Sequence, residues 1–560
     1  MNSTYVSQSI VDINKSLKTF SRNVIITGKN LTIPEILSVA RNNVSVQITN
    51  DKTTLNKIKE SYTHMIEQVK NGTPMYGTNS GYGAQATRVV ADGTENERLH
   101  HAKKISEGIV HVDVTTGPPL DDDVVRAAMA IRVNMLMQGV SAVKLNDLET
   151  YCKMLNAGIT PIVGQYGGIG ASGDLAHNGR ILSAARGLPG IKVRDAIGEI
   201  QEAAKALDQK GISKLVLDPK AGLGFVNGDN FSTALATLLA VDTLELLLLS
   251  DVVGAMVIET LTGTDRSFHP LLAKVRPHKG QEEVANLYLY LLNGSKYAYQ
   301  ELKGFKRREQ GVRIQDGYSL RCISQYHGVN HEKIKRILDT ITVNANSVSD
   351  NPLWVSPEYT TKGEKPWQWV GGGNFIASYM VDVLDELRKI MTQIVKLNDR
   401  HMALLVNQRE SNGLPPNLSD DASITHCSFK GIQIQSGMYE VYSSLLSIPV
   451  STFYGVHEEG NQDVTSHAIT SAIFGMENLR LVRYSLAQNL LAVCQAVDLR
   501  GSPSNLSPKT KPLYDFIRSK TTYVKEERPL AQDVETIYDA IKDKSVNNIV
   551  KKHVLQTFAA

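Results

Sequence analysis

The stretch from residue 164 to residue 174 reads Gly-Gln-Tyr-Gly-Gly-Ile-Gly-Ala-Ser-Gly-Asp, and its centre has the residue types needed for backbone cyclisation. In a tight fold, the amide nitrogen of Gly173 can attack the carbonyl carbon of Ala171. Loss of two waters, one carrying the Ser172 hydroxyl, would leave a five-membered ring with an exocyclic methylene. That methylene is an electrophile, which no standard side chain supplies. The upstream glycines permit the unusual dihedral angles of a compressed loop. The alternative is an ordinary Gly-rich loop without chemistry.

Two further groups of residues have side chains that can take part in chemistry. Tyr76 lies in a Gly-punctuated loop, where a phenol could accept a proton if a helix N-terminus or a cation lowered its pKa. Arg321 can clamp a carboxylate through two parallel hydrogen bonds, and Tyr318, three residues earlier, would share a helix face with it. Taken alone, Tyr76 also fits a core tyrosine beside a turn, and Arg321 also fits a structural ion pair.

The composition is that of a soluble globular protein with a large core. The chain has 560 residues, of which 42% are hydrophobic and 21% charged. A net charge of +3 without a polybasic segment argues against nucleic acid or a membrane surface as a partner. The first thirty residues lack an apolar stretch, so no secretory signal is expected. The four cysteines form no metal-ligand or disulfide pattern, which favours reduced thiols and a cytoplasmic protein: Cys152, Cys322, Cys427 and Cys494.

The elements that must position these residues are mainly helical. A helix start is expected at residues 32–35, and apolar residues recur at helical spacing over residues 121–139. Three segments of roughly thirty residues each lie near the upper tail of helix lengths and predict a central bundle: 231–261, 376–406 and 467–497. Acidic residues interrupt the first segment, so we expect a buried helix there and not a membrane span.

The predicted fold class is therefore mainly α, with a smaller α+β region at the N-terminus. We expect a catalytic region over residues 1–220 that carries the Gly-rich loop. The long-helix bundle would occupy residues 221–501, and a charge-rich helical tail residues 502–560.

The Gly-rich loop resembles the signature of the aromatic amino acid ammonia-lyases and aminomutases. Further matches follow in the family's order along nearly the whole chain: residues 76–83, 222–228, 315–322, 349–353, 372–375, 429–431 and 458–463. The resemblance implies the ammonia-lyase fold, of the fumarase/aspartase type. It also implies the prosthetic group 4-methylidene-imidazole-5-one (MIO), formed from Ala171, Ser172 and Gly173, with no metal and no nucleotide.

The resemblance also assigns roles to residues. Tyr76 would remove the β-proton of the substrate, and Tyr318 would reach the active site of a neighbouring subunit in a homotetramer. Arg321 and Asn351 would contact the substrate carboxylate, and Asn227 would hold either that carboxylate or the MIO carbonyl. Leu223 and Phe375 would lie near the aromatic ring. The matched segments supply the other predicted substrate-binding residues: Gly83, Leu175, Gln315, Lys430, Glu458, Asn461 and Gln462.

Three positions bear on which amino acid is the substrate. Histidine-specific members generally have a glutamate where this chain has the neutral Gln462, which favours an aromatic side chain without a basic nitrogen. The family's ring-selectivity pair, often Phe-Leu or His-Leu, aligns with Lys104 and Ile105, and a lysine there is a departure. Its ammonium could meet a para-hydroxyl on the ring, or its stem could follow the pocket wall to water.

A second departure follows the signature loop. The family usually has a Pro-Leu pair after Gly-Asp-Leu, whereas this chain has Ala176, His177 and Asn178. His177 could be a core residue or could support the site.

The implied activity is the removal of ammonia from L-phenylalanine, with L-tyrosine as a second substrate, to give trans-cinnamate or p-coumarate. An aromatic 2,3-aminomutase would share the same residues and differ in how long the active-site loop stays closed. A histidine ammonia-lyase and a catalytically silent homologue are further alternatives. The silent homologue would be favoured by loss of Tyr76, Ser172 or Tyr318, and all three are present.

Overall fold

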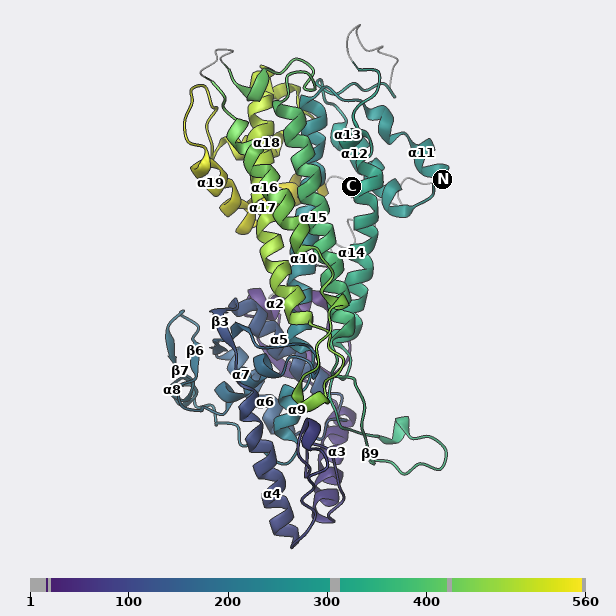
Figure 1. Ribbon diagram of the computed structural model, residues 1–560, viewed down its shortest axis with the longest axis vertical. Coiled ribbons are helices and arrows are strands. Elements are labelled where there is room, and N and C mark those ends of the chain that lie inside the picture. Colours follow the sequence, from purple (N-terminus) through teal and green to yellow (C-terminus); the bar gives the residue numbers. More distant parts are fainter. Residues whose placement is uncertain (1–16, 19–21, 303–312, 421–425, 556–560) are drawn as a thin grey trace.

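The computed structural model describes residues 17–18, 22–302, 313–420 and 426–555. Figure 1 shows a tall bundle of long helices that stands on a smaller region built from the first part of the chain. The described residues of the first part of the chain form three short sheets, and two strands from much later in the chain, β8 (Leu353–Trp354) and β9 (Trp369–Val370), form a fourth. About 59% of the chain is helical, which confirms the mainly α fold class.

The N-terminal region alternates short strands with helices. Its main elements are β1 (Val24–Ile26), α2 (Ile33–Arg41), β2 (Val46–Ile48), α3 (Lys52–Lys70), α4 (Glu95–Gly108), β3 (Thr116–Pro119), α5 (Asp122–Leu136), α6 (Leu145–Asn156), β4 (Thr160–Pro161), β5 (Gly164–Tyr166), α7 (Leu175–Ala185), β6 (Lys192–Arg194), β7 (Ile200–Glu202), α8 (Ala203–Gln209) and α9 (Ala221–Val226). The predicted start of α2 is confirmed, because Thr32 and Glu35 form a reciprocal capping box. The predicted helix over residues 121–139 is also confirmed as α5.

The bundle and the tail follow. Their elements are α10 (Asn230–Thr260), α11 (Pro270–Lys274), α12 (Lys279–Leu292), α13 (Tyr318–Arg321), α14 (Ile323–Ala345), β8 (Leu353–Trp354), β9 (Trp369–Val370), α15 (Ser378–Val406), α16 (Lys430–Leu446), α17 (Ala468–Leu499), α18 (Lys511–Arg518), α19 (Ala531–Lys542) and α20 (Ser545–Val550). Helices α10, α15 and α17 confirm the three long helices expected from the apolar segments.

Helix α10 is the axis of the bundle. Every residue of α10 except Glu245 is buried, and the helix packs against α5, α14, α15 and α17. Because α5 belongs to the N-terminal region, one continuous hydrophobic core runs through both parts of the molecule. The division at residues 220 and 501 stays a prediction; residue 220 lies directly before α9, and residue 501 lies just after α17.

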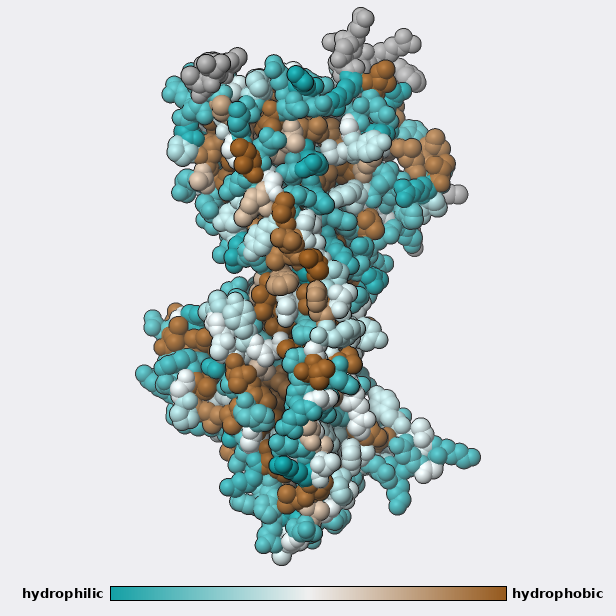
Figure 2. Space-filling view, viewed as in Figure 1, coloured by the Kyte–Doolittle hydropathy of each residue, from teal (hydrophilic) through white to brown (hydrophobic). Residues whose placement is uncertain are grey.

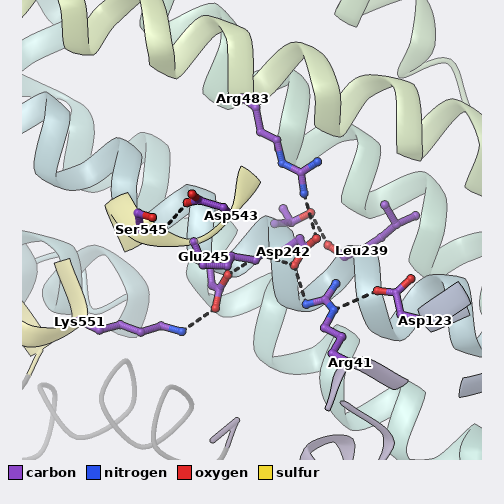
Figure 3. Close-up of polar contacts among 11 residues, drawn as sticks. Arg41, Asp123, Leu239, Asp242, Glu245, Arg483, Asp543, Ser545 and Lys551 are labelled. Atoms are coloured by element: carbon purple, nitrogen blue, oxygen red, sulfur yellow. Dashed lines mark hydrogen bonds and ion pairs between the residues drawn. The ribbon is translucent and has the colours of Figure 1, made fainter. Parts of the chain in front are cut away.

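Two acidic residues of α10, Asp242 and Glu245, are paired with cations from distant segments (Figure 3). Asp242 accepts hydrogen bonds from Arg41 at 2.9 Å, Arg483 at 3.0 Å and Lys544 at 2.6 Å. Glu245 accepts hydrogen bonds from two lysines of the tail, Lys544 at 2.7 Å and Lys551 at 2.6 Å. Burial alone would raise the pKa of Asp242, but these cations hold it well below its usual range. The α10 carboxylates therefore join the N-terminal region, α17 and the tail to one helix.

Among the described residues, no helix combines the length and apolarity needed to cross a membrane.

Candidate active site

The signature loop, residues 164–174, connects β5 to the start of α7. Gly173 has a φ of +67°, and a Cβ there would collide with the backbone of Gly228. The two glycines form an isolated parallel bridge, and the Asp174 amide donates to the Gly228 carbonyl at 2.9 Å. Only glycine combines this left-handed dihedral with so close a backbone contact. The loop is therefore held in a compact shape at Gly173, the residue whose amide nitrogen would close the five-membered ring.

Segments from the far part of the chain hold the middle of the loop. The Ala377 amide, just before α15, donates to the Gly170 carbonyl at 3.2 Å. The Ser466 hydroxyl donates to the same carbonyl at 3.1 Å, and the His467 amide, at the start of α17, donates to the Ile169 carbonyl at 2.8 Å. Segments at the start of two bundle helices therefore hold the middle of the loop.

These contacts bring the N-termini of α7, α10, α15 and α17 to the loop. Each helix N-terminus carries a partial positive charge, so the loop lies in an electropositive setting that favours developing negative charge. Asp174, buried at the end of the loop, accepts hydrogen bonds from the Ser232 amide at 2.6 Å and hydroxyl at 2.7 Å. Burial raises the pKa of Asp174 to about 7, although these two donors lower it in part.

A cavity of about 460 Å³ opens over the loop. It is lined by most of the residues predicted from the sequence: Tyr76, Gly83, Ala171, Ser172, Leu175, Leu223, Asn227, Asn351, Phe375, Glu458, Asn461 and Gln462. Gly173 follows directly after Ser172. Residues separated by nearly four hundred positions in sequence therefore meet around the Ser172 hydroxyl.

Tyr76 lies in this cavity with its hydroxyl accepting a hydrogen bond from the Gly83 amide at 3.0 Å. A side chain on Gly83 would occupy the place of the Glu458 carboxylate, so Glu458 lies directly beside this pair. Burial raises the pKa of Tyr76; the Gly83 amide lowers it in part, and Glu458 raises it further. These neighbours therefore do not provide the lowered pKa that Tyr76 would need in order to accept a proton, because the charged group that acts on the phenol is an anion and not a cation.

A short turn positions three further predicted residues. Glu458 and Glu459 have φ values of +53° and +56°, which is a strained backbone for residues other than glycine. Asn461 donates its side-chain amide to Glu458 at 2.7 Å. Gln462 donates from Nε2 to the Ser172 hydroxyl at 3.2 Å, so it contacts the centre of the signature loop directly.

Two asparagines form the polar wall of the cavity. Asn227 donates from Nδ2 to the backbone carbonyl of Asn351 at 3.1 Å, and Asn351 accepts from the Gly372 amide through Oδ1 at 2.8 Å. Each amide group has two hydrogens, so both asparagines keep a donor for a ligand.

Two buried cations, Arg132 and Lys220, connect the segments that contain Asn227 and Asn351. Arg132 donates to the backbone carbonyls of Ser349 at 2.7 Å and Asn227 at 3.1 Å. Lys220 and Asp350 form an ion pair at 2.6 Å in which both side chains are fully buried. Since breaking a buried pair leaves an unpaired charge, this arrangement fixes the two segments firmly relative to each other.

Four predicted residues lie away from the cavity in the single chain. Gln315 and Arg321 line a separate hollow of about 490 Å³ beside α13, and Tyr318 lines another of about 580 Å³. Tyr318 is 74% exposed, and the Arg321 guanidinium lies 4.5 Å from the centre of its ring. Lys430, the first residue of α16, is exposed.

The predicted selectivity pair does not line the cavity either. The buried face of α4 presents Ala102 and Ser106, whereas Lys104 lies on the exposed side. Ile105 contributes only its backbone carbonyl, which accepts a hydrogen bond from Tyr82 at 3.0 Å. The structure thus corrects the expectation that Lys104 borders the substrate ring.

We therefore expect Lys104→Phe to leave substrate choice unchanged. The ammonium of Lys104 is exposed and makes no contact with the cavity. The ratio of kcat/KM for L-phenylalanine to kcat/KM for L-tyrosine should therefore change by less than about twofold, which is a smaller effect than the loss of one hydrogen bond. Steady-state kinetics with both amino acids check this. A change of several-fold in this ratio would mean that Lys104 borders the substrate ring after all.

The cavity also has lining residues that the sequence did not single out: Tyr82, Ala86, Ile109, His111, Val112, Gly372, Gly373, Ile376, Asp463 and Val464. Most lie within or beside a matched segment, so proximity in sequence to Tyr76, Phe375 or Gln462 was the available signal. The stretch that follows α4 carried no such signal, because the alignment placed the ring contacts within α4, at Lys104 and Ile105.

His177 and Asn178, the two residues after the signature loop that depart from the family pattern, contact the loop and the backbone beside it. His177 is fully buried, its Nε2 lies 3.1 Å from the Gln165 carbonyl, and its ring packs 5.0 Å from that of Phe231. Burial lowers the pKa of His177 to about 4, so its imidazole is neutral. Asn178 donates to the Gly228 carbonyl at 3.1 Å, on the same backbone that presses against Gly173.

Among the described residues, no group of three or more His, Cys, Asp or Glu side chains is arranged to hold a metal ion.

Comparisons with known proteins agree with this geometry. Residues 31–519 match the family model described as aromatic amino acid lyase. A phenylalanine ammonia-lyase of Nostoc punctiforme is 33% identical over 92% of this chain and 90% of its own length. A histidine ammonia-lyase of Clostridium tetani is 30% identical over 90% of this chain and 92% of its own. The crystal structure of a tyrosine aminomutase from Streptomyces globisporus superimposes with a TM-score of 0.85 at 27% identity, covering 95% and 99% of the two chains.

Proposed function

The chain belongs to the aromatic amino acid lyase family, and we propose that within it this enzyme removes ammonia from L-phenylalanine, and also from L-tyrosine, to give trans-cinnamate or p-coumarate. The observation that supports this proposal is the meeting of Tyr76, the two asparagines and Ser172 around one cavity. The cavity offers amide donors for a carboxylate and apolar side chains for a ring.

The family is known to use MIO, and the loop residues fit that group. Gly173 is pressed against Gly228 in a conformation that excludes any side chain, and four helix N-termini surround the loop. Ala171, Ser172 and Gly173 would form the ring, and Gln462 would contact it from the position where it now meets the Ser172 hydroxyl. When formed, the group supplies an electrophile that turns the amino group into a better leaving group.

The residues around the loop would bind and orient the amino acid. The spare donors of Asn227 and Asn351 suit its carboxylate, and Tyr76 is the proton acceptor for the β-carbon. The ammonium of the incoming substrate would neutralise Glu458, the carboxylate that now helps to raise the pKa of Tyr76. Substrate binding would in this way favour the phenolate form of Tyr76.

A second copy of the chain would complete the site. Tyr318 and Arg321 are exposed or half-buried on α13, away from their own cavity. Helix α16 carries an exposed apolar stripe at helical spacing: Ile434, Met438, Val441 and Leu445. Figure 2 shows hydrophobic surface gathered where the bundle narrows towards the N-terminal region. Such surface is typical of an interface, and the family is known to form tetramers.

Arg321→Lys should lower kcat/KM about tenfold or more. The Nε of Arg321 is buried and has no hydrogen-bond partner among the described residues, so the planar fork has an unused donor for a carboxylate. Lysine keeps the charge but loses the fork, which corresponds to about 1.4 kcal/mol. Kinetics with L-phenylalanine measure this, with Arg336→Lys, an exposed arginine of α14 that lines none of these hollows, as control. Unchanged kcat/KM in Arg321→Lys would remove Arg321 from the site.

An aromatic aminomutase is the second candidate, favoured by the fold shared with the tyrosine aminomutase. The distinguishing experiment incubates the purified protein with L-phenylalanine, L-tyrosine and L-histidine and separates the products. The proposal expects α,β-unsaturated acid and ammonia from the first two. β-Amino acid would favour the mutase, urocanate the histidine lyase, and no product the silent homologue.

A further inference from the structure

The single turn α13 carries Tyr318 and Arg321 at the end of the bundle that lies away from the N-terminal region (Figure 1). Tyr318 is 74% exposed, and its ring contacts the Arg321 guanidinium, whereas Leu320 is the buried residue of the turn. An exposed side chain is not held in place by packing. The position of the Tyr318 hydroxyl therefore depends on how the backbone of α13 is fixed.

Polar contacts from two other segments fix that backbone. Directly before the turn, the Asp316 carboxylate accepts a hydrogen bond from the Thr264 amide at 2.9 Å. Within the turn, the Ser319 carbonyl lies 2.9 Å from Nε2 of His401 on α15. The helical pattern is interrupted at Cys322, between α13 and α14, and the last carbonyls of a helix lack partners within it. His401 supplies a partner for one of these carbonyls.

The His401 ring is buried in the bundle and is only 1% exposed. Because a carbonyl only accepts hydrogen bonds, Nε2 carries the hydrogen in this contact. Burial lowers the pKa of His401 to about 4; the Ser319 carbonyl raises it in part, and His327 lowers it further, so the imidazole is neutral. Its Nδ1 is also buried and, within the described part of the chain, has no hydrogen-bond partner. The polar contact of this ring is therefore directed at α13.

The helix that follows α13 is fixed by a separate group of residues. Asp251 on α10 accepts hydrogen bonds from Nδ1 of His327 at 2.7 Å and from Nε2 of His331 at 2.8 Å, and all three side chains are buried. These bonds hold α14 to α10. His401 instead connects α13 to α15, so its loss should affect the turn more than the helix after it.

We propose that His401 is a positioning residue for the reaction: its Nε2 holds the Ser319 carbonyl, and this contact fixes the turn that presents Tyr318 and Arg321 to the neighbouring subunit. The inference rests on the proposed function, in which a second copy of the chain completes the site. His401 acts through the backbone of α13 and does not itself touch the substrate.

The experiment compares His401→Phe and His401→Gln with the parent enzyme. Phenylalanine keeps a ring but removes the donor, whereas glutamine keeps an N–H donor on its side chain. Asn398→Leu is the matched control, because Asn398 is equally buried on α15 and its side-chain amide has no hydrogen-bond partner among the described residues. His401→Leu repeats the measurement if His401→Phe does not fold.

Hydrogen exchange measures the turn directly, on peptides that cover residues 313–323. In His401→Phe these amides should exchange about five- to tenfold faster, as expected when one hydrogen bond is lost. The value of kcat/KM for L-phenylalanine should fall about tenfold or more, because catalytic groups must be held in a productive geometry. His401→Gln should retain most of both properties, and Asn398→Leu should change neither.

Subunit mixing separates a positioning role from a general loss of stability. His401→Phe mixed with Tyr76→Phe should regain activity, because some sites then combine Tyr76 of one chain with an intact α13 of the other. His401→Phe mixed with Tyr318→Phe should stay inactive, because neither chain supplies a well-placed Tyr318. A residue that only stabilises its own chain would not sort in this way.

Three results would overturn the inference: unchanged exchange of α13 in His401→Phe, unchanged kcat/KM in that variant, or recovery of activity when it is mixed with Tyr318→Phe. The proposed function can fail separately. If the parent releases ammonia from neither amino acid, the proposed reaction is wrong, and hydrogen exchange still decides whether His401 holds the turn.

Discussion

Ser172→Ala should abolish ammonia release and restore the full mass of the chain. The parent should be two waters lighter than its sequence, because ring closure removes both, one of them with the Ser172 hydroxyl. Without that hydroxyl no exocyclic methylene can form, so kcat should fall on the order of 10⁴-fold or more, as when a covalent catalytic group is removed from other enzymes. Intact-mass spectrometry and an ammonia assay measure the two effects on the same sample.

The control is Ser504→Ala, an exposed serine beyond α17, which should keep both the mass deficit and the activity. A parent chain of full mass with undiminished lyase activity would exclude the ring. A mass deficit that persists in Ser172→Ala would place the modification elsewhere in the chain.

Mixing two inactive variants should restore activity if the site is shared between subunits. Tyr76→Phe removes the proton acceptor and should lower kcat by about 10²- to 10⁴-fold. Tyr318→Phe should cause a comparable loss, although Tyr318 lies outside the cavity of its own chain. A mixed oligomer contains sites with Tyr76 from one chain and Tyr318 from another, so some sites regain both hydroxyls.

The measurement is activity after subunit exchange, with exchange itself followed by native mass spectrometry of differently tagged chains. Mixing Tyr76→Phe with a Tyr76→Phe/Tyr318→Phe double variant is the matched control, because no site in that mixture can contain both hydroxyls. Confirmed exchange without recovery in the first mixture would make the composite site wrong.

The sequence predicted the long helices because they are marked by strong local signals. Helix α10 is buried on nearly all sides, so its apolar residues form an almost unbroken run, and its four acidic residues have partners from other segments. Helices α14 and α16 were not predicted. Their exposed faces mix polar and apolar residues. The apolar stripe on α16 has the spacing of a buried helix face, but in the fold it is exposed.

The site residues were found where a motif fixes both residue type and position, as for Tyr76 and Asn227. Lys104 was misplaced because an alignment gives the order of residues along α4 but not which side of the helix faces the cavity. Burial raises the pKa of Tyr76, and Glu458, which comes from the other end of the chain, raises it further. Such long-range electrostatics are set by packing, and no local pattern contains them.

The anchoring of the signature loop has a consequence for the timing of biosynthesis. The Ser466 hydroxyl that holds the Gly170 carbonyl lies 296 residues further along the chain. At translation rates of about 5–20 residues per second, that segment leaves the ribosome roughly 15–60 s after the loop does. Until then the nascent loop lacks at least the start of α17, one of the four helix ends that surround it. The compact shape of the loop is therefore reached late, after the segment that begins α17 has been made.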